Sequence, residues 1–260
     1  MPHTIVLAHG IFGFGSLSNV PLNYFNGVAA HLRRQGHLVI APQVNPIGSV
    51  RQRGGQLAEA ILEQLPDSRN IHVIAHSMGG LDTRYALTNI PGFAERIATL
   101  VTIGTSHRGS PVADAVAART GPLFDHIPAF LARCLEQNAG ALHDLTTPVG
   151  IHFDETTPDV QGVRYINVAG DASRGGHELY LFQLAAIIGR LNNGEVNDGV
   201  VTRSSALREG NEHLEDWPVD HAGEVGWSFA SPLPYEIEIP LVPPPSHFAL
   251  YDGIVSLLRS

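Results

Sequence analysis

The segment over residues 71–80 restricts the fold of this chain more than any other part of the sequence. It reads Ile-His-Val-Ile-Ala-His-Ser-Met-Gly-Gly, a β-branched run, then a serine between small residues, then a helical pattern. A strand that turns sharply into a helix needs small residues at the turn, and it lifts a serine hydroxyl above the edge of a sheet. We therefore predict that Ser77 is a nucleophile, with Ala75 where this motif usually has glycine. In the ordinary alternative, Ser77 only caps the helix that begins near Met78.

Short β-branched runs alternate with helical patterns along the chain. Strands are predicted over residues 3–8, 37–42, 71–75, 97–104 and 163–169, and helices over 24–34, 56–65 and 247–258. This alternation is typical of an α/β fold, in which helices flank a central, mostly parallel sheet. No repeat or linker divides the sequence, and 260 residues with 43% hydrophobic content can bury one large core. We therefore expect a single domain over residues 1–260.

Composition excludes several classes of function. A formal net charge of −9 argues against a basic surface for nucleic acid or anionic lipid. No apolar run reaches the roughly twenty residues of a membrane-spanning helix. The first residues lack the pattern of an export signal, and the single cysteine, Cys134, cannot form an internal disulfide. We expect a cytoplasmic location, although signal-less secretion or a processed mature form would also fit, and a small neutral molecule as partner.

A glycine-rich turn follows the first predicted strand. Residues 7–15 read Leu-Ala-His-Gly-Ile-Phe-Gly-Phe-Gly. Acyl-transfer enzymes need two backbone N–H groups aimed at the developing oxyanion, one from the residue after the nucleophile and one from a loop of a neighbouring strand. Met78 and Ile11 fit these two positions of an oxyanion hole. The alternatives are a flexible turn or a phosphate-binding loop, but no Lys-Ser/Thr pair follows and the glycine spacing is not a dinucleotide-binding fingerprint.

Four landmarks follow one another along the chain. They are the turn at residues 9–11, the serine segment at 76–80, the run Thr-Ile-Gly-Thr-Ser-His-Arg-Gly-Ser at 102–110, and Asn-Asp-Gly-Val-Val at 197–201 with a histidine downstream. In content and order they resemble the bacterial true lipases related to the Pseudomonas, Burkholderia and Proteus triacylglycerol lipases. The resemblance implies an α/β-hydrolase fold and esterase or lipase activity, and we expect no cofactor.

The fold implied by this resemblance carries its catalytic residues in the order serine, acid, histidine. Asp198 matches the acid of the family, which orients the imidazole, although the same residues could form a plain turn. Asp171, directly after the fifth predicted strand, is the rival acid. His221 matches the base of the family, with His213 and His247 as rivals downstream of the acid.

A long apolar insertion separates the fourth and fifth predicted strands, over residues 111–160. Gly121-Pro122 should start a helix within it, and Leu123, Phe124 and Ile127 share one apolar face. In lipases such an insertion is a helical cap, or lid, that covers the serine. Ordinary core packing is the alternative interpretation.

The predicted function is serine carboxylic-ester hydrolysis, by a lipase or esterase that forms an acyl-enzyme on hydrophobic acyl esters. Ser77 attacks the carbonyl, His221 moves the proton and Asp198 stabilises the imidazolium. A thioesterase or an acyltransferase would use the same triad, whereas an inactive hydrophobic-ligand binder predicts that a triad member is missing. The expected partner is an ester or lipid molecule, and transient contact with a lipid–water interface is left open. Acyl-chain length and oligomeric state do not follow from the sequence.

The resemblance also implies a calcium site with two aspartates, and this chain departs from it at both places. Gly223 stands two residues after the predicted base, where the family has one aspartate, and Glu178 stands in the upstream region of the other. Glu224 or Asp220 could substitute, but neither matches the pattern. Because Ca²⁺ requires several oxygen ligands, we expect no metal site and no effect of chelators. Ser204 replaces the second bridging cysteine of the family, in agreement with a fold without a disulfide.

Overall fold

A single parallel sheet forms the centre of the molecule in the computed structural model, which describes residues 1–11, 24–136, 139–175, 179–227 and 247–259. The sheet has the order β2-β1-β3-β4-β5-β6, and each neighbouring pair is parallel. The strands are Thr4–Ala8 (β1), Leu38–Ile40 (β2), Ile71–His76 (β3), Ile97–Ile103 (β4), Arg164–Val168 (β5) and Glu212–His213 (β6). The five predicted strands and the predicted α/β architecture are confirmed. The short sixth strand was not predicted, because two exposed residues show no alternation.

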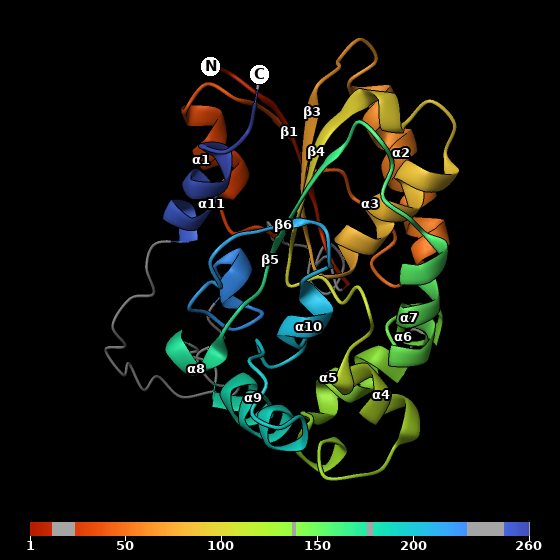
Figure 1. Ribbon diagram of the computed structural model, residues 1–260, viewed down its shortest axis with the longest axis vertical. Helices are drawn as coiled ribbons and strands as arrows, with labels where there is room; N and C mark the ends of the chain where they lie inside the picture. The colour runs from red at the N-terminus through yellow and green to blue at the C-terminus, as the bar shows by residue number, and fades with distance from the viewer. Residues whose placement is uncertain (12–23, 137–138, 176–178, 228–246, 260) are drawn as a thin grey trace.

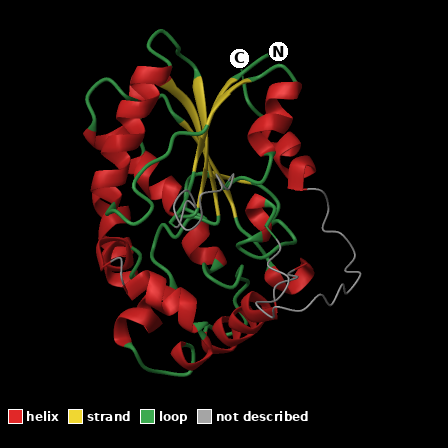
Figure 2. Cartoon of the chain, turned by 180° about the vertical axis from the view of Figure 1, so that it is seen from behind, coloured by secondary structure: helices red, strands yellow, loops and turns green. Residues whose placement is uncertain are grey.

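Helices cover both faces of the sheet. They are Val28–Arg34 (α1), Val50–Gln64 (α2), Met78–Asn89 (α3), Pro111–Ala118 (α4), Ala129–Glu136 (α5), Ala139–Asp144 (α6), Thr147–Thr156 (α7), Ala172–Gly175 (α8), Leu179–Leu191 (α9), Arg203–Ala206 (α10) and His247–Val255 (α11). Helices α1 and α11 lie on one face, and α2 and α3 lie on the other (Figures 1 and 2). Among the described residues, no helix combines the length and the apolar character needed to cross a membrane.

Two apolar cores result from the alternation of side chains along the strands. Ile5 and Leu7 of β1 point to the face of α1 and α11, where they join Phe25, Val28 and Tyr251. Val6 and Ala8 point to the opposite face, which packs on the apolar side of α2. The buried sheet is therefore a rigid support, and the loops at the carboxyl ends of its strands carry the polar groups described below.

Helix α2 begins earlier than the sequence pattern predicts. It starts at Val50, where the Ser49 side chain accepts a hydrogen bond from the backbone N–H of Gln52 at 3.3 Å. The pattern did not indicate this earlier start because Gly54 and Gly55 separate the first turn from the predicted helix. Gly54 has a steric role: an added Cβ would lie 2.8 Å from Cδ1 of Tyr85, so glycine lets α2 approach α3 closely. Helix α1 begins later than predicted, at Val28.

The insertion after β4 forms a group of short helices, α4 to α7, below the carboxyl ends of the strands (Figure 1). The predicted helix at Gly121-Pro122 is only one 3₁₀ turn, Phe124–His126, and α5 begins after Pro128. Leu123 and Ile127 are buried in a cluster with Leu184 and Ile188 of α9. The apolar face of the insertion therefore packs on α9, and we call residues 111–156 the cap.

Candidate active site

Ser77 occupies a strained turn between β3 and α3. Its backbone has φ 55° and ψ −130°, a conformation that non-glycine residues rarely adopt. Two hydrogen bonds hold it there: its N–H donates to the carbonyl of Ile103 at 2.9 Å, and the Thr105 hydroxyl donates to its carbonyl at 2.8 Å. The Ser77 side chain makes no capping hydrogen bond to α3, so the helix-cap alternative does not describe this residue.

The turn after β1 lies directly against this serine. A Cβ added to Gly10 would lie 2.7 Å from Cβ of Ser77, and one added to Gly79 would lie 2.8 Å from the carbonyl oxygen of His9. Glycine is required at both positions because the two backbones approach so closely. Ile11 follows in this turn, and Met78 is the first residue of α3, whose first N–H groups have no partner within the helix. The two predicted oxyanion-hole residues thus lie on segments that meet beside Ser77.

Three predicted residues form one hydrogen-bonded array. Oγ of Ser77 lies 3.0 Å from Nε2 of His221, and Nδ1 of His221 lies 2.8 Å from Oδ2 of Asp198. The backbone N–H of His221 also donates to the carbonyl of Asp198 at 3.0 Å. If Nδ1 carries the proton that faces Asp198, then Nε2 is the acceptor for the serine proton.

Backbone donors hold the carboxylate of Asp198 in place. Its Oδ1 accepts hydrogen bonds from the N–H groups of Val200 at 2.8 Å and Val201 at 2.6 Å. The rival Asp171 serves a different purpose, since its Oδ1 accepts from the N–H and the hydroxyl of Ser173 at 3.0 and 2.6 Å. The structure therefore joins Asp198 to the histidine, whereas Asp171 stabilises the start of α8.

The rival histidines are engaged elsewhere. His213 lies in β6 and its Nε2 bonds to the carbonyl of Arg208 at 2.8 Å. His247 begins α11, as expected for a residue at a helix end, and its Nε2 bonds to the carbonyl of Asn26 at 2.9 Å. Of these three histidines, the one that reaches Ser77 is His221.

A second polar array, formed by Glu224, His76 and Tyr24, contacts His221, and it was not predicted from the sequence. Oε2 of Glu224 lies 2.9 Å from Nε2 of His76 and 3.4 Å from Nδ1 of His221. Nδ1 of His76 in turn lies 2.7 Å from the hydroxyl of Tyr24. The spacing of three residues between His221 and Glu224 was visible in the sequence, but nothing there indicated that residue 76 would be the partner of the glutamate.

Burial and neighbouring charges shift the pKa values of the titratable groups in this site. Desolvation raises the pKa of Asp198 and of Glu224, because both carboxyl groups are fully buried. Desolvation, followed by the nearby His221, holds the pKa of His76 well below its usual range. For His221, desolvation favours the neutral form, but Asp198 and then Glu224 outweigh it and raise its pKa.

The buried side chain of Arg53 holds the turn after β1 in place. Arg53 of α2 is fully buried and pairs with Asp82 of α3, with Nη2 2.7 Å from Oδ2. The same guanidinium donates to the carbonyl of His9 at 2.7 Å and to the carbonyl of Asn45 at 3.0 Å. Arg53 therefore connects the strand end that precedes Gly10 to both helices of that face.

The residues near the base do not fit the calcium site of the resembled family. Oδ1 of Asp220 accepts the N–H of Gly223 at 2.8 Å, and Glu224 faces the two histidines. Glu178 lies outside the described residues. Within the described part of the chain, His76, His221 and Glu224 form a group of potential metal ligands within 4.8 Å of one another. Glu224 is hydrogen-bonded to His76, and His221 is hydrogen-bonded to Asp198 and Ser77, so we interpret the group as part of a polar network.

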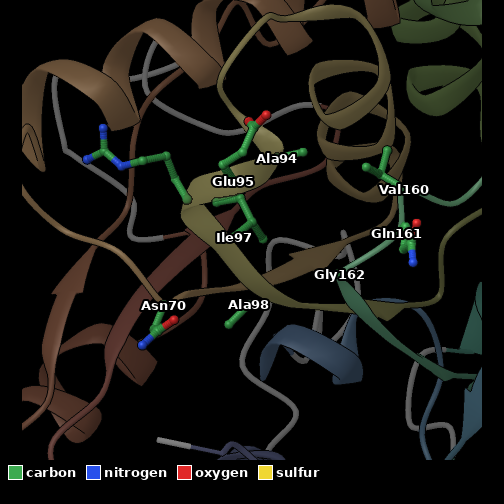
Figure 3. Close-up of a pocket in the computed structure, with 9 residues that line it drawn as sticks. Asn70, Ala94, Glu95, Ile97, Ala98, Val160, Gln161 and Gly162 are labelled. Carbon is green, nitrogen blue, oxygen red and sulfur yellow. The ribbon is translucent and has the colours of Figure 1, made fainter.

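The cavity shown in Figure 3 lies away from this array. It encloses about 420 Å³ and is lined by residues at the amino ends of β3, β4 and β5, among them Asn70, Ile97 and Gly162. Ser77 follows the carboxyl end of β3, at the opposite edge of the sheet. The serine itself is buried, with 6% of its surface exposed. The described residues around it thus form a covered site.

Comparisons with known proteins find similarity to lipases. A family model described as the PGAP1-like alpha/beta domain matches residues 55–170. A triacylglycerol lipase of Vibrio cholerae is 28% identical over 254 residues, covering 86% of this chain and 79% of the lipase. Triacylglycerol lipase 2 of Saccharomyces cerevisiae is 31% identical over 219 residues, and the alignment covers 79% of this chain and 63% of the yeast protein. The crystal structure of Staphylococcus hyicus lipase has the same fold, with a TM-score of 0.74 and 16% identity over 98% of this chain and 95% of that one.

Proposed function

We propose that this chain, whose fold is that of the lipase structure compared above, is an α/β-hydrolase that hydrolyses carboxylic esters through an acyl-enzyme formed on Ser77. The observation that carries the proposal is the continuous array from the serine hydroxyl through His221 to Asp198, with distances of 3.0 and 2.8 Å. A strained serine, an acceptor imidazole and an ionised acid in this order are the parts that acyl transfer requires.

The reaction follows from these contacts. Nε2 of His221 takes the proton of Ser77 while Oγ attacks the ester carbonyl, and the imidazolium then protonates the leaving alcohol. The carboxylate of Asp198 stabilises the imidazolium, and the N–H groups of Ile11 and Met78 stabilise the oxyanion. In the deacylation step, His221 takes a proton from water, which attacks the acyl-enzyme and releases the carboxylic acid.

Apolar side chains near the oxyanion turn favour a hydrophobic acyl group as substrate. Ile11 and Met78 belong to a cluster with Leu81 and with Ala141 and Leu145 of the cap. Ile11 also contacts the cluster that joins the cap to α9. An acyl chain that leaves the serine on this side would meet carbon atoms, so burial of the chain would contribute to binding. The cap then acts as the lid of the site.

The four sequence landmarks favour a finer placement among the bacterial true lipases. All four meet at one site: the turn at 9–11, the serine segment at 76–80 and the acid turn at 197–201 surround Ser77, and the run at 102–110 holds the serine turn through Ile103 and Thr105. The departure at Gly223 and the engagement of Glu224 by His76 support a member of that group without its calcium site.

Rates on a series of esters test the proposal. We expect the purified protein to cleave p-nitrophenyl esters, with kcat/KM rising with acyl-chain length, and to release fatty acid from emulsified triglyceride. Acyl-coenzyme A thioesters and added alcohols serve as parallel arms, because a thioesterase or an acyltransferase would prefer them. No hydrolysis of any ester by a protein that reacts with a fluorophosphonate would contradict the assignment.

A further inference from the structure

Two carboxyl groups face the same nitrogen of the proposed base. Nδ1 of His221 lies 2.8 Å from Asp198 and 3.4 Å from Glu224. Glu224 is fully buried and Asp198 is 1% exposed. Among the described residues, no arginine forms an ion pair with either carboxyl group, and the sequence contains no lysine. Two ionised carboxylates beside a neutral imidazole would therefore be two uncompensated charges in a buried site, which is strongly unfavourable.

One additional proton would reduce the negative charge of the site. That proton can lie on the imidazole of His221 or on one of the two carboxyl groups, and the net charge of the site is the same in both cases. On Nε2 of His221 it makes an imidazolium, which cannot accept the proton of Ser77. With both carboxylates ionised, the pKa of His221 would rise to about 10, even though desolvation acts in the opposite direction. On one of the carboxyl groups, the same proton leaves the imidazole neutral and able to act as a base.

The hydrogen bonds distinguish the two carboxyl groups. Asp198 accepts two backbone N–H groups in addition to the imidazole, and such donors stabilise the ionised form. Glu224 accepts no backbone N–H among the described residues, and its Oε1 is buried without a hydrogen-bond partner there. The geometry points to Glu224 as a positioning residue that acts as a neutral carboxylic acid, so that Asp198 is the sole charged partner of His221.

His76 and Tyr24 hold the glutamate in this state. In one tautomer, the Tyr24 hydroxyl donates to Nδ1 of His76 and the Nε2–H of His76 donates to Oε2 of Glu224, but the carboxyl proton then lies on Oε1, which has no hydrogen-bond partner among the described residues. In the other tautomer, Glu224 donates from Oε2 to Nε2 of His76. Both arrangements satisfy His76 and leave Glu224 neutral, in keeping with a raised pKa for Glu224 and a lowered pKa for His76, each caused first by desolvation.

The other described groups around Glu224 add no positive charge. The hydroxyl of Tyr251 in α11 donates to the backbone carbonyl of Glu224 at 3.0 Å, and desolvation raises the pKa of that tyrosine, so it stays neutral. A Cβ added to Gly170 would lie 2.5 Å from Oε1, so the backbone after β5 closes the pocket on that side. The groups that titrate with Glu224 are thus Asp198, His221 and His76.

Difference infrared spectroscopy on the whole protein at neutral pH tests this inference, which rests on the proposed function. Subtracting the spectrum of Glu224→Gln from that of wild type should show the loss of a protonated carboxyl C=O band. The matched control is Glu59→Gln, an exposed glutamate of α2, which should lose carboxylate bands only. Loss of carboxylate bands in both variants would overturn the inference. If Glu224→Gln does not fold, the protonated band in wild type must shift on [¹³C]glutamate labelling, and an unshifted spectrum overturns it instead.

The acid limb of the kcat/KM profile gives a second readout. Glu224→Gln should leave its midpoint within roughly 0.3 unit of wild type, because one neutral group replaces another. Removal of an ionised carboxylate beside the imidazole would lower that midpoint by about 1 unit or more. Glu224→Ala, which loses the contact with His76, should reduce kcat by about 10- to 100-fold. An inactive wild type that keeps the protonated band rejects the proposed function alone, and an active wild type with an ionised Glu224 rejects this inference alone.

Discussion

The turn at Ser77 and the cap over residues 111–156 are held in place by different interactions. At the turn, backbone geometry restricts which residues fit. Ser77 has a positive φ, and a Cβ at Gly10 or Gly79 would collide with a neighbouring segment of the protein. In the cap, most of the contacts are made by side chains, although Gly150 of α7 also lies close to the backbone at Gly109. The short helices pack through apolar residues such as Leu123 and Ile127.

One charged cluster supplements that apolar packing of the cap. Asp154 of α7 forms ion pairs with Arg84 of α3 at 3.0 Å, with Arg208 at 2.6 Å and with Arg108 at 3.2 Å. Arg84 is 2% exposed and also donates to the carbonyl of Thr157 at 2.5 Å. The C-terminal end of the cap is therefore tied to the helix that begins at the serine.

This contrast separates two kinds of mutational effect. A constraint carried by the backbone leaves few residue types acceptable at a position, so substitutions there act on the chemistry. A constraint spread over many side chains tolerates exchange at each of them, so substitutions act on stability. The following experiments test that separation.

The largest effect is expected at the turn. Ser77→Ala removes the proposed nucleophile, and we expect kcat to fall by roughly 10⁴- to 10⁶-fold with little change in the melting temperature. Steady-state hydrolysis of a p-nitrophenyl ester and labelling by a fluorophosphonate measure the result. A Ser77→Ala variant that is still labelled and active would remove the serine from the mechanism.

The next effect concerns the acid. Asp198→Asn should reduce kcat by up to about 10⁴-fold, because the amide no longer fixes the productive tautomer of His221. Asp171→Asn serves as the matched control and should stay close to wild type in kcat, since its contacts are to Ser173. The reverse ranking would transfer the role of the acid to Asp171.

A smaller effect, on stability, is expected in the cap. Asp154→Asn leaves three guanidinium groups without their shared carboxylate, at a cost of roughly 2–3 kcal/mol, which is about 5–10 °C in melting temperature. The control is Asp159→Asn, because Asp159 is more exposed and pairs with Arg208 alone among the arginines described. Calorimetry and kcat should be measured together. A large loss of kcat without loss of stability would show that the cluster acts on the chemistry.

No effect is expected from chelation. Gly223 offers no ligand, and the carboxyl groups of Asp220 and Glu224 are engaged within the protein. EDTA should therefore change neither the melting temperature nor the rate of ester hydrolysis. A drop of several degrees that added calcium reverses would show that other carboxylates bind the ion.

The same contrast explains which features the sequence could predict. The strand that carries the serine was predicted over 71–75 and is found at Ile71–His76, because its signal is local: a β-branched run, then small residues at a tight turn. The Ser77, His221 and Asp198 side chains could be brought together from their order along the chain and a family resemblance. The local strand pattern and the order of the three residues can both be read from one sequence, without knowledge of distant contacts.

Features that depend on distant partners were not predictable in this way. Arg53 lies before the predicted helix over 56–65, and its complete burial accompanies a pairing with Asp82, 29 positions further along the chain. Glu224 was considered only as a substitute metal ligand, since its partner His76 is 148 positions away. The helical start in the cap was placed at Gly121-Pro122, but tertiary packing and Pro128 leave a single 3₁₀ turn there.

The double connection between Asp198 and His221 has a consequence for engineering. Their side chains and their backbones are both hydrogen-bonded, at 2.8 and 3.0 Å, so the two residues are fixed relative to each other, while the serine lies in the turn after β3. Residues 197–221 can therefore be treated as a cassette. A designer who replaces the serine with another nucleophile, or transplants this cassette to a related scaffold, must preserve the 3.0 Å contact between Nε2 and Oγ, the pairing of β6 with β5 and the contact of His221 with Glu224.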